Sequence, residues 1–546
     1  MMTPRIEQSL PPEISIQFGM PPQSLTTLLP IRLNTRLAAN QIPNATLVLK
    51  QPGGDRKEVE KFSADAQRCL PGTTVRIELK DNNKSTVLFT GIVAEQHNHW
   101  TLDGNELTLR LCHLLQGALS SHGSQVFSNM TDEEALRQLL RLYKVDLGPS
   151  RGMMSIRHPQ LVQYECSDWQ FIKARLHANG VWLWPDVSGG VSIAPPALSS
   201  AKHMLAQDAK VLTGESSHTP LIEIADWIFS SRELTSEVHT ITWNTKNQKA
   251  ETRQSQPKQL GSNALDPKML VQLGPKSQTF HAARNLQDEE LDAWANSRLL
   301  AMQAASVRGT FTVIGSSAYQ LGETLELKGF GKTLDGQGVI SGIEHHMTPG
   351  RWRTDVTLGQ DTINVSLVPA TPGLQIGVVS HYQSDPDNLD RLQVEVPIFG
   401  NAKLWARFAK PFASKDSGAC FYPEPGDEVV LGFFEADPRF PVILGAMHNP
   451  KQPSPIDPVK HLQQRGLILK QGDKQQQLLF DGEAQTVQLQ AADKEHLMLG
   501  AKTGFAAQSQ QDVQIKGKNL TLQADTALEA RGQQVKVKGN KVDVGA

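Results

Sequence analysis

Several short groups of residues in this chain have the types and spacing that phosphate or metal binding requires. The run GFGKT at 329–333 matches the end of a phosphate-binding loop, whose backbone N–H groups and lysine hold a polyphosphate. The complete pattern needs a further glycine five positions before Gly331, and Glu326 stands there. We therefore predict a glycine turn between two strands rather than a nucleotide site.

Two histidine pairs and one acidic run are the other candidates for a site. His97 and His99 would share a face of a strand, as metal ligands must, and 345–346 hold a second pair. Neither pair has an acidic or histidine companion set nearby, so we predict surface or interface histidines. The acidic run 288–290 stands where a helix begins, where negative charge is stabilising. We assign no catalytic residue, no cofactor and no metal ligand, and neither GxSxG nor HExxH occurs.

The charge balance bears on nucleic-acid binding, and the cysteine spacing bears on disulfides and metal sites. The chain has 54 basic and 56 acidic side chains, and its formal net charge is −2 at pH 7. This balance offers no electrostatic footprint for nucleic acid, so we expect no nucleic-acid partner. The cysteines lie far apart without a CxxC pair, which predicts reduced, buried thiols rather than a disulfide framework or a zinc site. They are Cys69, Cys112, Cys166 and Cys420.

The start of the chain and its hydropathy bear on localisation. The run MMTPRIEQSLPPEISIQF shows no basic region followed by an apolar one, as a secretory signal would. No segment approaches the roughly 18 apolar residues of a membrane helix. We expect a protein that is made in the cytoplasm without a signal peptide.

The elements that would position any site are mainly β-strands. The chain of 546 residues has 42 glycines, 32 prolines and 6% aromatic residues, which is typical of several domains built from short strands and turns. Residues 1–120 alternate apolar and polar side chains, as at 75–79, and predict a first β-barrel. Residues 201–370 repeat this pattern and predict a second barrel, with an excursion and a helix at 246–305. The segment 246–285 is polar and nearly featureless, which indicates a long exposed loop.

Residues 121–200 change to a helical period between the two barrels. Thr131 and Glu134 form a capping-box pattern that predicts a helix start. A second helix is predicted to begin after Ser167 and to stop at Asn179, because Gly180 can adopt the left-handed conformation that ends helices. This part is therefore a helix-containing subdomain.

The C-terminal part of the chain reads as a compact β unit, a linker and a fibrous tail. Residues 371–450 form the compact unit, and 451–465 are a proline-rich linker. From 466 to 546 nearly every segment is apolar-x-apolar at a spacing of a few residues, which is typical of fibrous β structure. One such strand cannot bury its two apolar side chains alone, whereas three copies around a common axis can.

The tail therefore predicts a trimeric β-helix, a rigid needle with a dry axis. Its outward positions are mostly charged or polar, which keeps such a needle soluble. The residues predicted to form the needle core share the apolar positions of these strands. They are Leu467, Leu469, Leu478, Phe480, Val487, Leu489, Leu497, Leu499, Val513, Ile515, Leu520, Leu522, Val535 and Val537.

Residues 374–450 also carry the pattern of a known family. The runs DRLQVEVPIFGNAKLWARF and FYPEPGDEVVLGFFEADPRFPVILGAMHNPKQP resemble, in order and spacing, the oligosaccharide-binding-fold (OB) domain of VgrG spike proteins of type VI secretion and of phage tail spikes. Residues 163–185 are similar to a segment of the hub of those proteins. The first 120 residues depart from the pattern. This departure, the short length and the expected absence of an extra C-terminal domain together look more like spike proteins of extracellular contractile injection systems, of the antifeeding-prophage and Photorhabdus virulence-cassette type.

The resemblance implies a mainly β protein with two hub β-barrels with helical insertions, an OB-fold β-barrel and an intertwined trimeric needle. It implies that a homotrimer seats on a hexameric inner tube protein, contacts baseplate proteins and touches the target membrane only transiently, as it punctures it. A PAAR-type tip protein would bind at Val542, Val544 and Ala546. Effector cargo, and assembly into a phage-tail-like particle that some machines release from the cell, are further implications.

Two other functions remain alternatives at this point. A phage tailspike-type enzyme would need a cleft with paired carboxylates, and the tail offers only scattered acids at solvent positions. A glycan-binding protein would use the OB barrel, because such barrels often bind ligands. We expect a structural protein rather than an enzyme, and the residues do not decide between a phage, a type VI and an extracellular machine.

Overall fold

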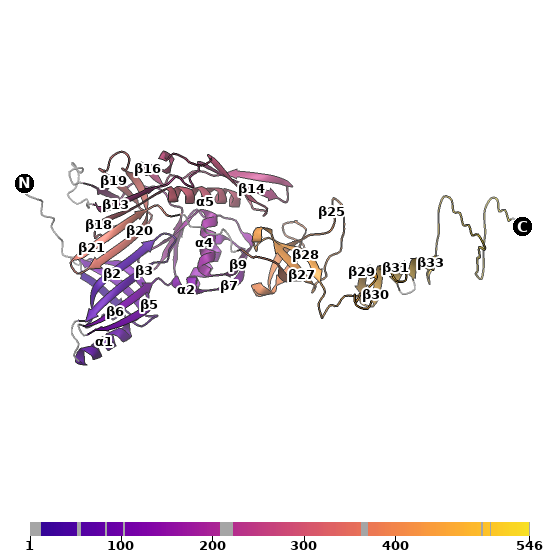
Figure 1. Ribbon diagram of the computed structural model, residues 1–546, viewed down its shortest axis with the longest axis horizontal. Helices are drawn as coiled ribbons and strands as arrows, with labels where there is room; N and C mark the ends of the chain where they lie inside the picture. Colours follow the sequence, from indigo (N-terminus) through magenta and orange to yellow (C-terminus); the bar gives the residue numbers. More distant parts are fainter. Residues whose placement is uncertain are drawn as a thin grey trace, which may run out of the picture. The chain divides into compact units, whose positions relative to one another are not determined.

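The computed structural model describes residues 13–51, 56–81, 84–101, 104–207, 222–361, 370–492, 495–502 and 504–544, and the statements below concern these residues. The chain divides into two compact units, Met1–Met447 and His448–Ala546 (Figure 1). Among the helices in the described ranges, none is both long enough and apolar enough to cross a membrane.

One large sheet joins the two strand-rich blocks of the first unit (Figure 1). Its strands in pairing order are β1 (Glu13–Phe18), β4 (Thr74–Asp81), β5 (Lys84–Thr101), β6 (Gly104–Cys112), β3 (Asn44–Gln51), β2 (Leu29–Ala38), β20 (Gly336–Thr348), β21 (Arg351–Leu358), β18 (Val307–Ile314) and β13 (Ile222–Phe229). The short strands β12 (His203–Ala206), β19 (Thr324–Lys328) and β16 (Gly261–Asn263) pair beside β20.

The seam between the blocks is the antiparallel pair β2 and β20, in which Leu37 lies opposite Ile343. Alternating side chains of the first block bury a core that includes Leu47, Ile77 and Leu109. Strands of the second block bury a separate core around Phe311. The structure confirms the strands that the alternation predicted in both blocks. The domain boundaries drawn from the sequence remain predictions.

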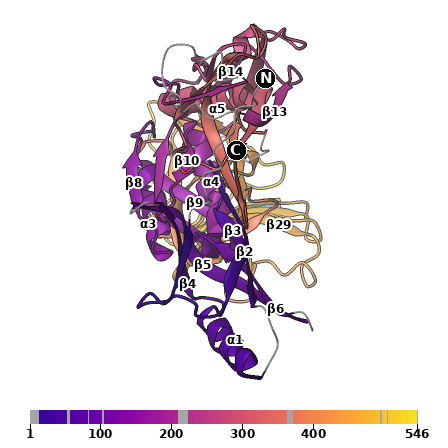
Figure 2. The same cartoon turned by 90° about the vertical axis from the view of Figure 1, so that its left-hand side faces the viewer.

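A helix in the first block was not predicted. Helix α1 (Arg56–Arg68) is rich in charged residues and lies within residues 1–120, for which only a β-barrel was predicted. Phe62 of this helix is buried in the first core, and its ring meets the Trp100 ring edge-on at a centroid distance of 5.4 Å. Figure 2 shows α1 at one end of the molecule in that view. Tertiary contacts therefore stabilise this helix: Phe62 packs into the core, and buried Asp65 accepts hydrogen bonds from the Thr26 and Thr27 N–H groups.

The helix starts and stops predicted between the blocks are confirmed. Helix α3 (Asp132–Leu142) begins after Thr131, whose hydroxyl accepts a hydrogen bond from the Glu134 N–H at 3.2 Å, and the capping box is complete. Helix α4 (Asp168–Asn179) begins after Ser167 with the same motif and ends at Gly180, which has a φ of 63°. A short helix, α2 (Gln116–Ser120), precedes them.

The strands beside these helices complete the subdomain. They are the ribbon of β7 (Gly123–Met130) and β9 (His158–Cys166), and the sheet of β10 (Trp182–Pro185), β11 (Val191–Ala194) and β8 (Leu147–Ser150). The helices and these strands share one core, in which Leu139, Phe171 and Leu183 are buried.

The prediction of a featureless loop at 246–285 is wrong. Two strands of this segment pair with β14 (Glu237–Asn244): β15 (Lys249–Gln254) lies on one side of it and β17 (Ser277–Ala282) on the other. The predicted helix follows as α5 (Asp288–Ser306) and covers this sheet, as Figure 1 shows. The strands escaped prediction because Thr, Glu and Gln, not apolar residues, dominate them, and one face gains its burial only from α5.

The predicted OB unit is confirmed as a closed barrel. Its strands in pairing order are β22 (Gln375–Val379), β23 (Arg391–Val396), β24 (Ala402–Phe408), β28 (Pro441–Met447) and β27 (Glu428–Phe433). The inward positions of the motif, such as Val394, Leu404 and Leu431, form its core. Short pieces complete it: η3 (Pro397–Phe399), η4 (Phe434–Ala436), and the hairpin β25 (Ala413–Ser414) and β26 (Ser417–Gly418).

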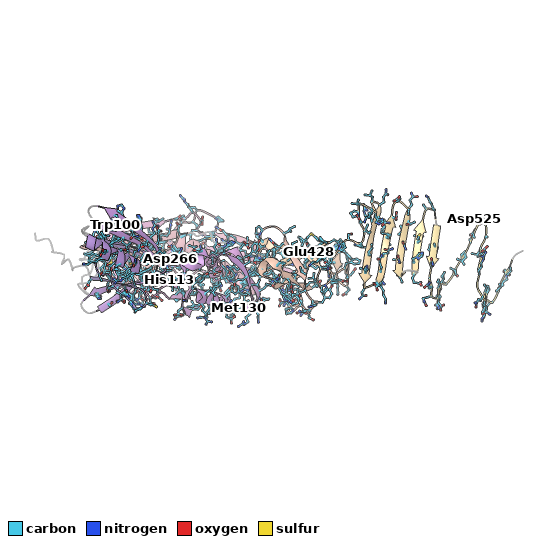
Figure 3. The ribbon with its side chains drawn as sticks, turned by 90° about the horizontal axis from the view of Figure 1, so that it is seen from below. Trp100, His113, Met130, Asp266, Glu428 and Asp525 are labelled. Atoms are coloured by element: carbon cyan, nitrogen blue, oxygen red, sulfur yellow. The ribbon has the colours of Figure 1, made fainter. Side chains whose placement is uncertain are left out.

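The second unit contains one antiparallel meander of five described strands, which Figure 3 shows side by side. They are β29 (Gln464–Gln471), β30 (Lys474–Asp481), β31 (Thr486–Ala492), β32 (Glu495–Gly500) and β33 (Gly504–Gln508). Residues 509–544 form no strand within this single chain.

Candidate assembly surface

The register of the meander places its predicted core residues on one face of the sheet. Leu467 lies opposite Leu478, Leu478 opposite Leu489, and Leu489 opposite Leu497. Because side chains directly opposite one another in antiparallel strands point to the same side, these residues form a continuous row across four strands. The complete apolar sheet face comprises Leu467, Leu469, Leu478, Phe480, Val487, Leu489, Leu497, Leu499 and Phe505.

Phe505 is the member of this face that the sequence analysis missed. It lies opposite Leu499 at the last strand of the meander. Its signal in the sequence was weak because its alternate neighbour is Ala507, a small residue, instead of a second large apolar one. Phe505 is 69% exposed, so the apolar face continues to the edge strand without cover.

The apolar sheet face is open to solvent within one chain. Leu489 is 55% exposed and Phe480 47% exposed, although both sit in the interior of the sheet. Burying a large apolar side chain stabilises by about 1.5–3 kcal/mol, so leaving this face half exposed forfeits roughly 5–10 kcal/mol per chain. A contiguous apolar face of this kind marks a contact surface.

The opposite face of the same sheet carries a cluster of hydrogen-bonded glutamines beside Ile468, Leu479 and Met498. Gln477 Nε2 donates a hydrogen bond to Gln490 Oε1 across the strands at 2.9 Å, and Gln475 Nε2 donates to Gln477 Oε1 at 2.9 Å. Gln488 Nε2 contributes a longer bond to Gln490 Oε1 at 3.3 Å. The two faces therefore differ in composition, because only the opposite face carries this network of bonded amides.

The rest of the predicted needle core lies beyond the meander. Val513, Ile515, Leu520, Leu522, Val535 and Val537 are all exposed, each by more than half. Of the predicted tip interface, Val542 and Val544 are exposed as well, whereas Ala546 lies outside the described residues. These apolar residues have neither strand pairing nor a core to bury them within one chain.

The sequence-level candidates for phosphate and metal binding do not converge on a site. Residues 329–333 form the predicted turn between β19 and β20, with Gly329 and Gly331 at φ near 88° and 89°. The rings of His97 and His99 lie 6.3 Å apart between centroids. Among the residues that the structure describes, no group of three or more His, Cys, Asp or Glu side chains is arranged to hold a metal ion.

Two predictions about individual side chains are wrong. His345 is buried, not at the surface: its Nδ1 lies 2.9 Å from Thr354 Oγ1, and burial together with the charge of His346 lowers its pKa to about 4. Cys420 is exposed in the barrel's hairpin region, whereas the other three cysteines are buried free thiols as predicted. Burial raises the pKa of the Cys69 thiol to about 12.

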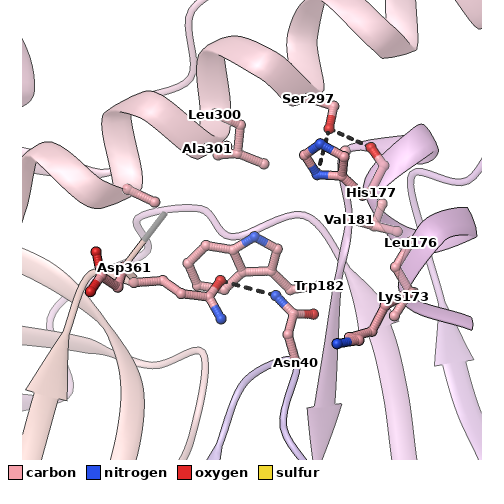
Figure 4. A pocket seen from close by; sticks show the side chains of 13 residues that line it. Asn40, Lys173, Leu176, His177, Val181, Trp182, Ser297, Leu300, Ala301 and Asp361 are labelled. Carbon is pink, nitrogen blue, oxygen red and sulfur yellow. Dashed lines mark hydrogen bonds between the residues drawn. The ribbon is translucent and has the colours of Figure 1, made fainter. Parts of the chain in front are cut away.

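A small cavity between α4, α5 and β10 is lined by His177, Trp182 and Asn40, as the close-up in Figure 4 shows. Its volume of about 60 Å³ is space for about two water molecules. Burial and the nearby Arg298 charge lower the pKa of His177 to about 4. The Asn40 amide donates to Gln360 Oε1 at 3.0 Å, so this polar group is occupied by structural contacts.

Comparison with known proteins gives two family matches and relatives among spike proteins. Residues 24–349 match the family described as the Alg8 N-terminal domain, and residues 375–448 match the type VI secretion system/phage-baseplate injector OB domain. The type VI secretion system spike protein VgrG1a of Pseudomonas aeruginosa is 23% identical over 453 residues, which are 73% of this chain and 65% of that protein. This chain thus matches just under two thirds of that relative's length.

Solved structures show the same fold. A chain of the lidless PdpA–VgrG complex superimposes with a TM-score of 0.58 at 9% identity, covering 91% of this chain and 98% of that chain. The Escherichia coli c3393 protein, described as a component of the type VI secretion system, superimposes with a TM-score of 0.50 at 12% identity, covering 80% and 100%. The resemblance to VgrG-type spike proteins that the motifs predicted is confirmed.

Proposed function

This chain belongs to the family of the Alg8 N-terminal domain, and from this membership and its VgrG-like fold we propose that it is the central spike and hub of a contractile injection machine. In this role it is a structural protein. It would adapt a hexameric inner tube to a trimeric needle that pierces a membrane and carries a tip protein.

The observation that carries the proposal is the apolar sheet face of β29–β33. An open sheet with an exposed apolar face and two free edges needs a partner that covers both, and further copies of the same sheet supply it. Three copies around an axis would bring three such faces together into one core and remove every free edge. The exposed apolar pairs from Val513 to Val537 would then pair and bury in the same way.

The hub role rests on the architecture of the first unit. Two strand-rich blocks per chain are joined by the β2–β20 pair. Three chains would present six blocks in a ring, which is the symmetry a hexameric tube protein requires. Baseplate proteins would contact the outside of this ring.

The remaining partners follow from the same role. A PAAR-type tip protein would bind where Val542, Val544 and Ala546 end the needle, and effector cargo would travel with the spike. The chain would be made in the cytoplasm, enter a phage-tail-like particle, in some systems one that is released, and touch the target membrane only during puncture.

Sedimentation of the full chain tests the trimer. We expect a native mass three times the 60.0 kDa of one chain. Leu489→Glu places a charge in the proposed core and should shift the particles toward monomer. Ala506→Glu adds the same charge to the exposed opposite face and should leave the trimer intact. A wild-type monomer at micromolar concentration would contradict the proposal.

A further inference from the structure

A single loop of the OB barrel, residues 434–440, carries most of its polar contacts to the rest of the first unit, and we name it the junction loop. It connects β27 to β28. Asp437 is 1% exposed and Arg439 is 9% exposed, so both charges are shielded from water although they belong to a loop. Phe440 packs against the apolar cluster of α5 and β17 that includes Leu291. The junction loop is therefore inserted into the hub and does not lie on the surface of the barrel.

Arg439 is the central group of this contact. Its Nη1 donates to Glu290 Oε1 of α5 at 2.7 Å, and its Nη2 donates to Asp437 Oδ2 at 2.9 Å. Arg284 Nη1 donates to the same Asp437 oxygen at 2.9 Å. Burial alone would raise the pKa of Asp437 and Glu290, but the charge of Arg439 outweighs it and holds both below their usual values. Both carboxylates are therefore ionised at neutral pH.

The contact continues from Glu290 into the helical subdomain. Glu290 Oε2 also accepts from the Gln287 N–H at 3.1 Å, which caps α5. His158 of β9 lies between two carboxylates: its Nδ1 is 3.9 Å from Glu290 Oε1, and its Nε2 is 3.5 Å from Asp132 Oδ2. Asp132 in turn accepts from Arg175 Nε of α4 at 2.5 Å. A chain of buried charges thus runs from the barrel to helices α3, α4 and α5.

A second contact closes a seam in the barrel itself. Strands β24 and β28 pair only at Arg407 and Phe408. Where they diverge, the Gln160 side chain of β9 enters: its Nε2 donates to the Arg439 carbonyl at 2.8 Å, and its Oε1 accepts from the Trp405 N–H at 3.0 Å. One amide of the hub therefore replaces a missing rung of the barrel's own hydrogen-bond ladder.

The backbone of the junction loop is strained, and hub residues hold it in place. Glu435 and Ala436 have φ angles of 51° and 56°, two consecutive non-glycine residues in the left-handed region. Glu435 Oε1 accepts from the Ala283 N–H at 2.8 Å, and Glu435 Oε2 lies 2.8 Å from Arg284 Nε. Such conformations persist where the surrounding structure imposes them. The junction loop therefore has the conformation that fits the barrel in its docked position.

We propose that Arg439 and Gln160 are positioning residues that lock the OB barrel onto the hub at one angle, so that barrel and hub move as a single rigid body. The purpose of the lock, passing axial force from hub to needle, rests on the proposed function. The lock itself rests on the geometry.

The chemistry of the lock favours one orientation over neighbouring ones. An apolar interface tolerates sliding, because its contacts are non-directional. A planar guanidinium between two carboxylates, together with an amide bonded at both ends, is satisfied in one arrangement only. Displacing the barrel would leave buried charges and amide groups without partners, which is costly.

Hydrogen–deuterium exchange on the full chain tests the lock. In Gln160→Ala we expect the Trp405 amide to exchange about tenfold faster than in the wild type, because its acceptor is lost. The amides of Val429 and Leu431 in the barrel should stay protected. Gln163→Ala is the matched control: it removes a buried glutamine of the same strand whose bonds, to Cys166 O and Asp168 Oδ1, stay inside the hub. The control should leave the Trp405 amide unchanged.

Thermal unfolding supplies the second measurement. The first unit of the wild type should melt in one cooperative transition, whereas Arg439→Met should split off a barrel transition. Arg439→Lys keeps the charge without the planar fork and should fall between the two. Unchanged Trp405 exchange in Gln160→Ala overturns the role of Gln160, and an unsplit transition in a folded Arg439→Met protein overturns that of Arg439.

These outcomes are separable from the fate of the proposed function. Sedimentation of every variant should still give the wild-type oligomer, because none of the changed residues lies in the second unit. If the wild type is a monomer but its variants show the expected exchange and melting, the spike function is contradicted and the lock is supported.

Discussion

The OB barrel and the meander of the second unit are each built from five described strands with alternating apolar residues, yet they use them in opposite ways. In the barrel the strands close on themselves, and Leu404 of β24 is fully buried. In the meander the strands stay open, and Leu489 of β31 is 55% exposed. The same local pattern therefore supports a self-sufficient domain in one place and an incomplete one in the other.

The difference lies in closure. A closed barrel buries its inward side chains and leaves no edge strand, so it needs no second chain. An open meander buries neither its apolar face nor its two edges, and a partner must do both. The unfolding free energy of the first unit should therefore be independent of protein concentration. The folding of the second unit should depend on protein concentration.

The largest effect we expect is in the self-sufficient unit. Asp132→Asn removes the carboxylate that faces Arg175 and leaves a buried charge without its partner, which should cost about 3–5 kcal/mol of unfolding free energy. Urea denaturation at two protein concentrations should give the same loss. Asp146→Asn, at an exposed position of the same subdomain, should cost under about 0.5 kcal/mol. A loss of unfolding free energy that varies with protein concentration would contradict a first unit that is stable without a partner.

One pair of identical substitutions contrasts the two regions most directly. Leu404→Ala should destabilise the barrel by about 2–5 kcal/mol at every concentration, because it creates a cavity in a closed core. Leu489→Ala should hardly change the stability of the first unit but should weaken the oligomer. Denaturation followed by intrinsic fluorescence, together with sedimentation, measures both. Equal effects of Leu489→Ala on both units would contradict a partner-dependent face.

The third effect is a loss of stability in acid that is confined to the first unit. His345 has a pKa of about 4 when folded, against 6.5 for an ordinary histidine. Between these values the unfolded chain binds the proton and the folded one does not, so stability falls as pH decreases from about 6.5 to 4, by roughly 3 kcal/mol in total. His345→Gln, which can still bond to Thr354, should flatten this part of the curve. Urea unfolding at pH 7.5 and 4.5 checks it.

The smallest effect concerns a helix cap. Thr131→Ala removes the acceptor for the Glu134 N–H and should cost about 1 kcal/mol, whereas Thr131→Ser should restore most of it. The melting temperature of the first unit should drop and recover accordingly. No change in sedimentation is expected for either variant. A change would mean that the helical subdomain contributes to the oligomer contact.

Local sequence patterns predicted the structural elements correctly wherever the physical cause of an element lies within a few residues. The caps at Thr131 and Ser167 and the stop at Gly180 depend on neighbours within four residues, and the structure has them as predicted. The OB barrel was predicted from the resemblance of residues 374–450 to a known domain, whereas their strand pattern alone predicted only a compact β unit. The apolar sheet face followed from the same alternation, with Phe505 omitted.

Sequence patterns gave wrong predictions where a side chain or strand is buried by an element far away in the chain. Helix α1 depends on the contact between Phe62 and Trp100, and the polar strands beside β14 depend on α5. His345 was predicted at a surface or interface because no companion set of metal ligands stands near the pair, but it is buried and its Nδ1 contacts Thr354 Oγ1 of β21.

The sequence by itself determined strand alternation, helix caps and the apolar stripe, because these arise from chain stereochemistry and from hydrophobic periodicity within a few residues. Only the tertiary structure decided that β2 joins β20, that Gln160 and Arg439 meet, and that the barrel closes while the meander stays open. These depend on which residues far apart in the chain come into contact, and no local pattern encodes that choice. The meander is the limiting case: its alternation is evident in the sequence, yet one chain alone gives its apolar face nothing to cover it.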